Sequence, residues 1–572
     1  MEPWSYEENG RVRRATPSDR KHGPLAVARP RSILGPTQAC GFAAAGPLAW
    51  GAEACRVMSS RVDVLLKRFR RAMARVRPWR ILLALPVVAA SLLGGCTVGP
   101  DFYRPPPPPV SGYTLGREIV HTVSAPSLAG AAQRFVRGRD IPGEWWALFH
   151  SPQLKSLIEE ALRNNPDLDA AQAALRVARA NANAQRGAFW PSVDGSFSAT
   201  RQRDAADNTG SPPATYNVFT GQVSVSYVPD VFGANQRAVE SLDAQTDAQR
   251  FQLEATHLTL TTNIVLAVVQ EASLRGQIAA TQKIIVIAKD VLDLLRRQRA
   301  LGQVAEADVV AQEAALAQIQ LTLPPLQRQL EQQQHLTATL VGRFPSRGPT
   351  QRFDLAMLRL PRDLPLSLPS KLVAQRPDVR AAEANLQSAS AQIGVAIANR
   401  LPNFAITATA GSTAFSLSHL FEPQANFWSV TASVLQPIFR GGALKEREIG
   451  ARAAYDQASA QYRSTVLAAF QNVADVLTAL KTDADALQKA VAAERAAERS
   501  LVITRERLRL GDINYLALLN AQQTYQQALI SVVQAQANRF ADTAALFQAL
   551  GGGWWNRSDV APPPDTSWMV FQ

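Results

Sequence analysis

The feature of this sequence that most restricts its fold is an internal duplication. Five helix-breaking landmarks recur in one order in two parts of the chain: a Pro-Asp pair, a proline 25 residues later, a third proline, a glycine after a long uninterrupted run, and a second glycine 40 residues further on. They fall at Pro166, Pro191, Pro229, Gly302 and Gly342, and again at Pro377, Pro402, Pro437, Gly511 and Gly551. Matching spacing over so long a distance indicates a tandem repeat of one large unit.

The positive charge of the chain lies mostly before residue 96, which argues against binding to nucleic acid. Residues 1–95 carry +10 of the formal net charge of +13, and the rest of the 572 residues carry only +3. A nucleic-acid-binding domain would show its basic excess in the folded part of the chain. The sequence also has no metal-spaced His pair, phosphate-binding Gly-rich loop or nucleophile elbow, so we expect neither an enzyme nor a bound cofactor.

Cys96 occupies the position expected for a lipid anchor. Three arginines between residues 75 and 80 precede an apolar run from Ile81 to Leu93, which has the length of a signal-peptide core and is short for a membrane span. The run ends in Leu93-Gly94-Gly95-Cys96, which resembles the lipobox of bacterial lipoproteins. This resemblance implies cleavage before Cys96, a diacylglycerol on its sulfur and an acyl chain on its new amino group. The alternative is a signal peptide with an incidental cysteine.

Two further features concern the ends of this anchor region. Thr97, rather than an aspartate, follows the cysteine, which resembles the signal for sorting to the outer membrane of Gram-negative bacteria. Residues 1–72 show no periodic pattern, so we interpret them as an unstructured leader or a mis-assigned start, with Met58 or Met73 as the true initiator. Because Cys96 is the only cysteine after residue 55, a disulfide framework or thiolate zinc site is not expected.

Between the anchor and the repeats, two short segments have distinct compositions. The proline run after Tyr103 predicts a stiff extended tether, because successive prolines form neither helix nor sheet. The cluster from Glu144 to Phe149 holds two tryptophans and a phenylalanine, and we expect it to pack against the first helix rather than to bind a ligand.

Each repeat contains two segments in which apolar residues alternate with Ser and Thr. They cover residues 193–200, 219–227, 404–408 and 428–434. This alternation predicts strands with one apolar face and is typical of transmembrane β-barrel strands, although a half-buried sheet in a soluble domain shows it too. Four strands cannot close a barrel, so a barrel would require several chains.

Each repeat also contains one long segment without proline, between Gly233 and Leu301 and between Gly442 and Leu510. As a helix, about 70 residues would extend about 100 Å at 1.5 Å per residue. In the first repeat we expect the return to be divided, with residues 307–341 and 377–401 together forming a single rod. A structural coiled coil is the alternative interpretation, but the alternating segments argue against it.

Together these motifs resemble those of the outer-membrane efflux factor family, the TolC-like proteins, and specifically its lipoprotein branch that includes NodT and OprM. The resemblance covers about residues 96–555 and includes both Pro-Asp helix starts, both glycine hairpins and the final Gly-rich segment before Trp554. It implies an α+β membrane protein in which three chains close a twelve-strand outer-membrane β-barrel, continued by a periplasmic helical barrel. The expected partners are two more copies of the chain, outer-membrane lipid, a periplasmic adaptor and an inner-membrane pump of the RND type.

The resemblance also assigns residues to two sites. The hairpin tips, with Gly302, Gln303, Asp308 and Gly511, resemble the ends that dock an adaptor. Leu516 and Asn520 match the positions where relatives place a leucine and an aspartate around the closed periplasmic aperture. Because Asn520 replaces the acid, a ring of carboxylates is absent at that level, and Asp512 or Asp308 could supply negative charge nearby. Simple capping of the hairpins is the alternative role for these residues.

We therefore predict the outer-membrane conduit of a tripartite efflux system that exports drugs or other small toxic compounds. A type I protein-secretion channel and an elongated structural lipoprotein without a pore are the alternatives. The expected organisation is a leader, a signal peptide, a lipid-anchored tether with its packing segment, two repeats and a tail. Their boundaries are 1–72, 73–95, 96–152, 153–352, 353–555 and 556–572.

Overall fold

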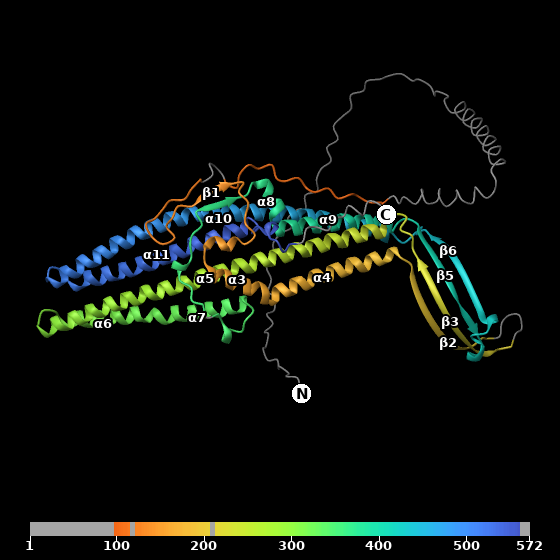
Figure 1. Ribbon diagram of the computed structural model, residues 1–572, viewed down its shortest axis with the longest axis horizontal. Coiled ribbons are helices and arrows are strands. Elements are labelled where there is room, and N and C mark those ends of the chain that lie inside the picture. The colour runs from red at the N-terminus through yellow and green to blue at the C-terminus, as the bar shows by residue number, and fades with distance from the viewer. Residues whose placement is uncertain (1–96, 115–119, 206–211, 350, 561–572) are drawn as a thin grey trace, which may run out of the picture. The chain divides into compact units, whose positions relative to one another are not determined.

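The computed structural model describes residues 97–114, 120–205, 212–349 and 351–560, all within one of the two units into which the chain divides, Ala90–Gln572 (Figure 1). The predicted leader, signal peptide and Cys96 lie outside these residues. The first repeat comprises α3 (Pro152–Asn164), α4 (Pro166–Arg186), β2 (Ser192–Arg203), β3 (Thr215–Tyr227), α5 (Ala234–Ala300), α6 (Glu306–Leu321) and α7 (Leu323–Leu340). The second comprises α8 (Pro369–Gln375), α9 (Pro377–Ala398), β5 (Asn403–Ala414), β6 (Asn426–Leu435), α10 (Ala443–Arg509) and α11 (Tyr515–Ala549).

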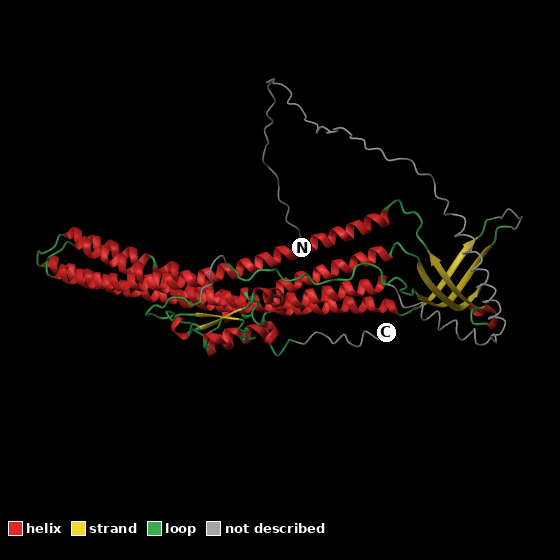
Figure 2. Cartoon of the chain, turned by 90° about the horizontal axis from the view of Figure 1, so that it is seen from above, coloured by secondary structure: helices red, strands yellow, loops and turns green. Residues whose placement is uncertain are grey.

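The four strands predicted from alternation form one antiparallel sheet in the order β2-β3-β5-β6, visible at one end of the unit in Figures 1 and 2. The middle pair, β3 and β5, joins the two repeats, because Val225 lies opposite Ala408 and Tyr227 opposite Ile406. The strands are 10 to 13 residues long, as expected for strands that cross a membrane at a tilt. β2 and β6 are the edges of this sheet.

The helices next to the sheet form a layer in the order α4, α5, α9, α10, which matches the strand order β2-β3-β5-β6. Next to the sheet, α4 contacts α5, α5 contacts α9, and α9 contacts α10. Further from the sheet, α6 and α7 contact α5, α5 contacts α11, and α11 contacts α10. The long helices α5 and α10, of 67 residues each, therefore run through both parts of the layer, as Figure 1 shows.

The shorter helices join end to end within each repeat, so the predicted rod from residues 307–341 and 377–401 is wrong. Asn165 caps α4 by accepting hydrogen bonds from the amides of Asp167 and Leu168, and its own amide donates to the carbonyl of Leu340 at the end of α7. In the second repeat, Arg376 before α9 donates to the carbonyl of Ala549 at the end of α11. The residue before each Pro-Asp pair thus connects that helix to the last helix of its own repeat, a long-range contact that helical periodicity does not reveal.

The predicted aromatic cluster forms the centre of the main hydrophobic core. Trp145 is fully buried, and its ring stacks on Phe547 of α11 with a centroid separation of 5.2 Å. Beside this core lies a two-stranded parallel sheet, β1 (Arg134–Arg137) with β4 (Asp363–Leu366), which the sequence did not predict. No helix among the described residues is long and apolar enough to cross a membrane.

Candidate channel wall and hairpin tips

The four-stranded sheet has one apolar face and one hydroxyl-rich face. One row across the sheet joins Val193, Val225, Ala408 and Val430, and the adjacent row joins Asp194, Ser224, Thr409 and Ser429. Trp428 on the apolar face has 78% of its surface exposed, whereas hydroxyls on the other face bond to one another across strands, as in the 2.6 Å contact between Thr409 and Ser429. An apolar face exposed in this way is stable only against lipid or another protein surface.

The sheet and the helical layer end at the same two places in the chain. One edge consists of β2 and α4, and the other of β6 and α10. Within the described residues, β2 and β6 each have a strand on one side only, and α4 and α10 each contact the layer on one side. An unpaired strand edge invites pairing with another chain. The described unit therefore has an unpaired edge on each side of its sheet.

The hairpin tips are built alike in both repeats. Gly302 follows α5 with a φ of 76°, and Gly511 follows α10 with a φ of 75°, a conformation that glycine adopts without a side-chain clash. The amide of Gln303 donates to the carbonyl of Gln298, and the amide of Asp512 donates to that of Arg507, which closes both helix ends in the same way. The predicted tight reversals at both glycines are confirmed, and both tips are exposed.

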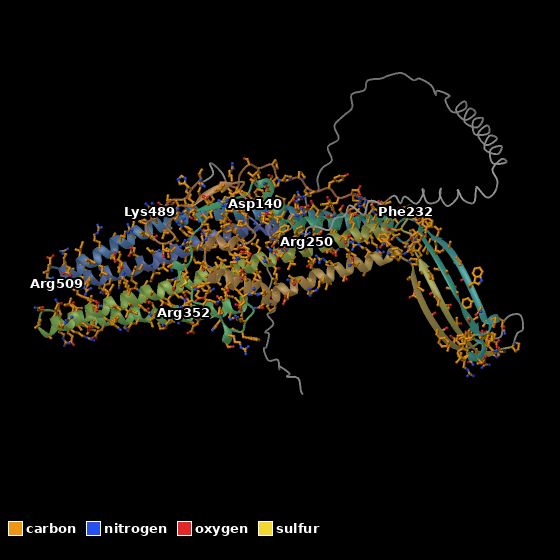
Figure 3. The ribbon with its side chains drawn as sticks, in the orientation of Figure 1. Asp140, Phe232, Arg250, Arg352, Lys489 and Arg509 are labelled. Carbon is orange, nitrogen blue, oxygen red and sulfur yellow. The ribbon has the colours of Figure 1, made fainter. Side chains whose placement is uncertain are left out.

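Asp512 has an ionic partner within its own tip. Its carboxylate lies 2.7 Å from the guanidinium of Arg507, and both side chains are exposed. In the same last turn of α10, Arg509, which is labelled in Figure 3, pairs with Glu506. The negative charge of Asp512 is therefore partly balanced by a residue of the same turn.

Leu516 and Asn520 lie one turn apart on the exposed side of α11, where Leu516 is 59% exposed. The opposite side of the same turns is buried, with Tyr515 and Leu518 in the core between the hairpins. The structure thus brings Leu516 and Asn520 onto one face, as a pair of aperture residues requires. Their facing toward a pore remains a prediction.

A buried hydrogen-bonded link holds this end of α11 to the first repeat, and the sequence did not predict it. The hydroxyl of Tyr515 donates to the side-chain oxygen of Gln312 in α6, and the amide of Gln312 donates to the carbonyl of Ala288 in α5 at 2.7 Å. Burial and the negative charge of Asp308 raise the pKa of Tyr515 to about 12. Asp308 therefore lies next to the link. The only sign of this link in the sequence was a tyrosine directly after Asn514, the residue that caps α11.

A second link joins α5, α10 and α11 further from the hairpin tips. The ammonium of Lys283 in α5 donates to the hydroxyl of Tyr525 in α11 at 2.6 Å, and that hydroxyl donates to Glu498 in α10 at 3.1 Å. The hydrogen bond that Lys283 donates to Tyr525, together with the negative charge of Glu498, raises the pKa of Lys283, so the lysine stays charged. Three helices from both repeats are joined at this point.

The segment after Cys96 is fixed where the sheet meets the helices. Thr97 packs against Gly233 so closely that a side chain at residue 233 would clash with it. The amide of Val98 donates to the carbonyl of Phe232, and the buried Arg237 donates to the carbonyls of Val98 and Gly99. Periodicity gave no sign of these contacts. No cluster of His, Cys, Asp or Glu suited to a metal ion occurs among the described residues.

Comparison with known proteins identifies the family. The model of the outer membrane efflux protein family matches residues 157–343 and 368–552. The pyoverdine export outer membrane protein OpmQ of Pseudomonas putida is 32% identical over 420 residues, covering 72% of this chain and 88% of its own length. The probable efflux pump outer membrane protein SepC, also of Pseudomonas putida, is 29% identical over 83% of this chain and 97% of its own.

Solved structures show the same fold. The outer-membrane channel OprN matches with a TM-score of 0.73 and 28% identity over 80% of this chain and all of its own. The outer membrane protein VceC of Vibrio cholerae matches with a TM-score of 0.68 and 27% identity over 73% of this chain and all of its own. The duplicated strand-and-helix plan is therefore the plan of a known group of channels, and this chain belongs to the outer membrane efflux protein family, as its motifs predicted.

Proposed function

We propose that three copies of this chain form a passive channel through the outer membrane, which carries small molecules from an inner-membrane pump to the exterior. The amphipathic four-stranded sheet with two open edges supports this proposal most directly. Its apolar face suits lipid, its hydroxyl-rich face suits water, and its edges suit pairing with further copies. Relatives named for pyoverdine export and for toluene, solvent and antibiotic efflux support small molecules rather than polypeptides as cargo.

The exposed hairpin tips are the proposed docking site for a periplasmic adaptor. Gly302, Gln303 and Gly511 lie at the ends of the hairpins, and Asp308 lies in the first turn of α6. Leu516, Asn520 and Asp512 are the proposed lining of the aperture just beyond these tips. In this arrangement the pump, for which we propose the RND type, supplies the energy.

Cys96 is the proposed site of lipid attachment. The following residue, Thr97, contacts Gly233, which directly precedes α5 at the sheet–helix junction. In an outer-membrane channel this junction would lie at the periplasmic surface of the membrane, where acyl chains on residue 96 could enter the lipid. Cys96→Ser should prevent attachment of the diacylglycerol and of the acyl chain on the amino group, which intact mass spectrometry detects as a change in mass far larger than that of the substitution itself. A change equal to the substitution alone would contradict lipidation.

Electron microscopy of detergent-solubilised protein from isolated outer membranes tests the channel. The expected particle has three-fold symmetry and a hollow stem of about 100 Å, from 1.5 Å per residue in α5 and α10. Monomeric or solid rods would favour a structural lipoprotein. A comparison of secreted proteins and of compound susceptibility in a deletion strain would then separate protein secretion from small-molecule efflux.

A further inference from the structure

A cavity of about 310 Å³ lies where the sheet joins the helices. Three connections of the chain surround it: β3 to α5, α9 to β5, and β6 to α10. Phe232, labelled at this junction in Figure 3, and Phe404 face each other with ring centroids 6.4 Å apart, and Leu435 and Leu444 add further apolar surface. The cavity could therefore accept an apolar chain.

Two arginines also line this cavity, and neither has an ionic partner among the described residues. They are Arg440, in the connection from β6 to α10, and Arg447, in the second turn of α10. Asp230, which also lines the cavity, accepts from the amides of Asn235 and Gln236, and Glu448 pairs with Arg400 and Arg452. Glu446, next to Arg447, forms no ion pair among the described residues. The positive charge of the two arginines is thus left for an external anion.

Comparison of the two repeats supports an anion at this place. In the first repeat, the connection before the long helix carries Asp230, whose carboxylate caps the start of α5. In the second repeat, the equivalent connection runs Pro437-Ile438-Phe439-Arg440-Gly441-Gly442 and has no acid, and no side chain caps α10. Glu446 is the only acid in the first turn of α10. An external anion would therefore stand where the first repeat has its own carboxylate.

The same connection exposes large apolar side chains. Ile438 is 90% exposed and Phe439 is 87% exposed, directly before Arg440. Apolar and aromatic residues followed by arginine are typical of the boundary between acyl chains and headgroups in a membrane. Both the charge and the apolar surface at this junction thus fit one amphipathic molecule.

We propose that this junction cavity binds an anionic phospholipid, with its phosphate held by Arg440 and Arg447 and an acyl chain against Phe232 and Phe404. Guanidinium groups hold phosphate oxygens through paired, charge-assisted hydrogen bonds, which makes arginine well suited to this role. The site would fix the chain at the periplasmic leaflet independently of the lipid on Cys96. The inference rests on the proposed outer-membrane location.

Native mass spectrometry of the full-length protein in detergent tests the site. Phosphatidylglycerol is added to wild type, to the double variant Arg440→Gln/Arg447→Gln, and to the control Arg499→Gln/Arg505→Gln, which removes the same charge from exposed positions of α10 near the tip. We expect one phosphatidylglycerol per chain in wild type and control, and affinity lower by about tenfold or more in the double variant. Arg440→Lys/Arg447→Lys should restore part of the binding, because it retains the charge.

Other outcomes would overturn the inference. Equal binding by the double variant, or equal binding of uncharged dipalmitoylglycerol by wild type, would show that the arginines do not select a phosphate. Binding of phosphatidylglycerol only in Cys96→Ser would show that the covalent lipid fills the cavity. If the double variant does not fold, the comparison of charged and uncharged lipid on wild type still decides.

Failure of the channel itself would give a different result. A wild-type protein that is absent from the outer membrane and gives no current in planar bilayers contradicts the proposed function. A protein that conducts but shows no preference for phosphatidylglycerol contradicts only the lipid site.

Discussion

Replacing Tyr515 with phenylalanine should loosen the contact between the two hairpin tips. The tyrosine is 6% exposed, and its hydroxyl donates to Gln312, which is fully buried. Phenylalanine keeps the ring but leaves the oxygen of Gln312 without this donor. An unsatisfied buried acceptor costs about 1–3 kcal/mol, which corresponds to about a fivefold to hundredfold shift per chain between the docked tip and an undocked tip.

Planar-bilayer recordings at neutral pH measure this shift, because an undocked tip widens the proposed aperture at Leu516. We expect Tyr515→Phe to spend more time in high-conductance states than wild type. Tyr455→Phe is the matched control, since Tyr455 of α10 packs against the main hydrophobic core and its hydroxyl forms no hydrogen bond among the described residues. Equal currents from Tyr515→Phe and this control would refute the idea that the link holds the tip.

The pKa of Tyr515 adds a second check on the same link. Since burial and Asp308 raise this pKa to about 12, the folded state favours the protonated hydroxyl. The stabilisation is fully present below the ordinary tyrosine pKa of about 10 and is lost only as the pH rises through about 12. Wild-type current should therefore show no titration from Tyr515 between about pH 6 and 9.

Three further changes give independent predictions. Asn520→Asp should increase cation selectivity, because three carboxylates would surround the proposed aperture, and an unchanged reversal potential under a salt gradient would place residue 520 outside the pore. Burial and the neighbouring Asp483 raise the pKa of Asp542 to about 7. Thermal stability should therefore fall as the pH rises from about 4 through 7. Asp542→Asn should flatten this part of the curve of Tm against pH. Arg539, 1% exposed, donates to the carbonyls of Ala129 and Ala131 and to the side chain of Gln133. Arg539→Met should therefore lower the free energy of unfolding by about 3 kcal/mol and make proteolysis of the 120–134 segment faster. Unchanged cleavage would argue against this anchoring role.

The parts of the fold that the sequence predicted are those encoded locally. Alternating apolar residues predicted the four strands, long segments without proline predicted α5 and α10, and Gly302 and Gly511 predicted the reversals. Each of these follows from backbone preference or from the period of a single segment. Cys96 lies outside the described residues, and its role stays a prediction.

The parts that the sequence did not predict depend on contacts between distant residues. The joint between Asn165 and Leu340 spans 175 residues, and the link between Tyr515 and Gln312 spans 203. The strand Asp363–Leu366 was missed because it is only four residues long and pairs with a segment before the first repeat. Such pairings depend on the packed structure, and a single sequence carries no periodic signal for them.

The directions of the strands are compatible with the proposed closure of several copies into a channel. Because neighbouring strands in the order β2-β3-β5-β6 are all antiparallel, β2 and β6 run in opposite directions. The β6 edge of one copy can therefore pair with the β2 edge of the next in the same antiparallel manner, and the ring closes through one repeated contact. Two copies would give eight strands, an interior that side chains of ordinary size nearly fill. In the trimer proposed above, three copies would give twelve strands, with every edge paired and a wider interior than eight strands provide.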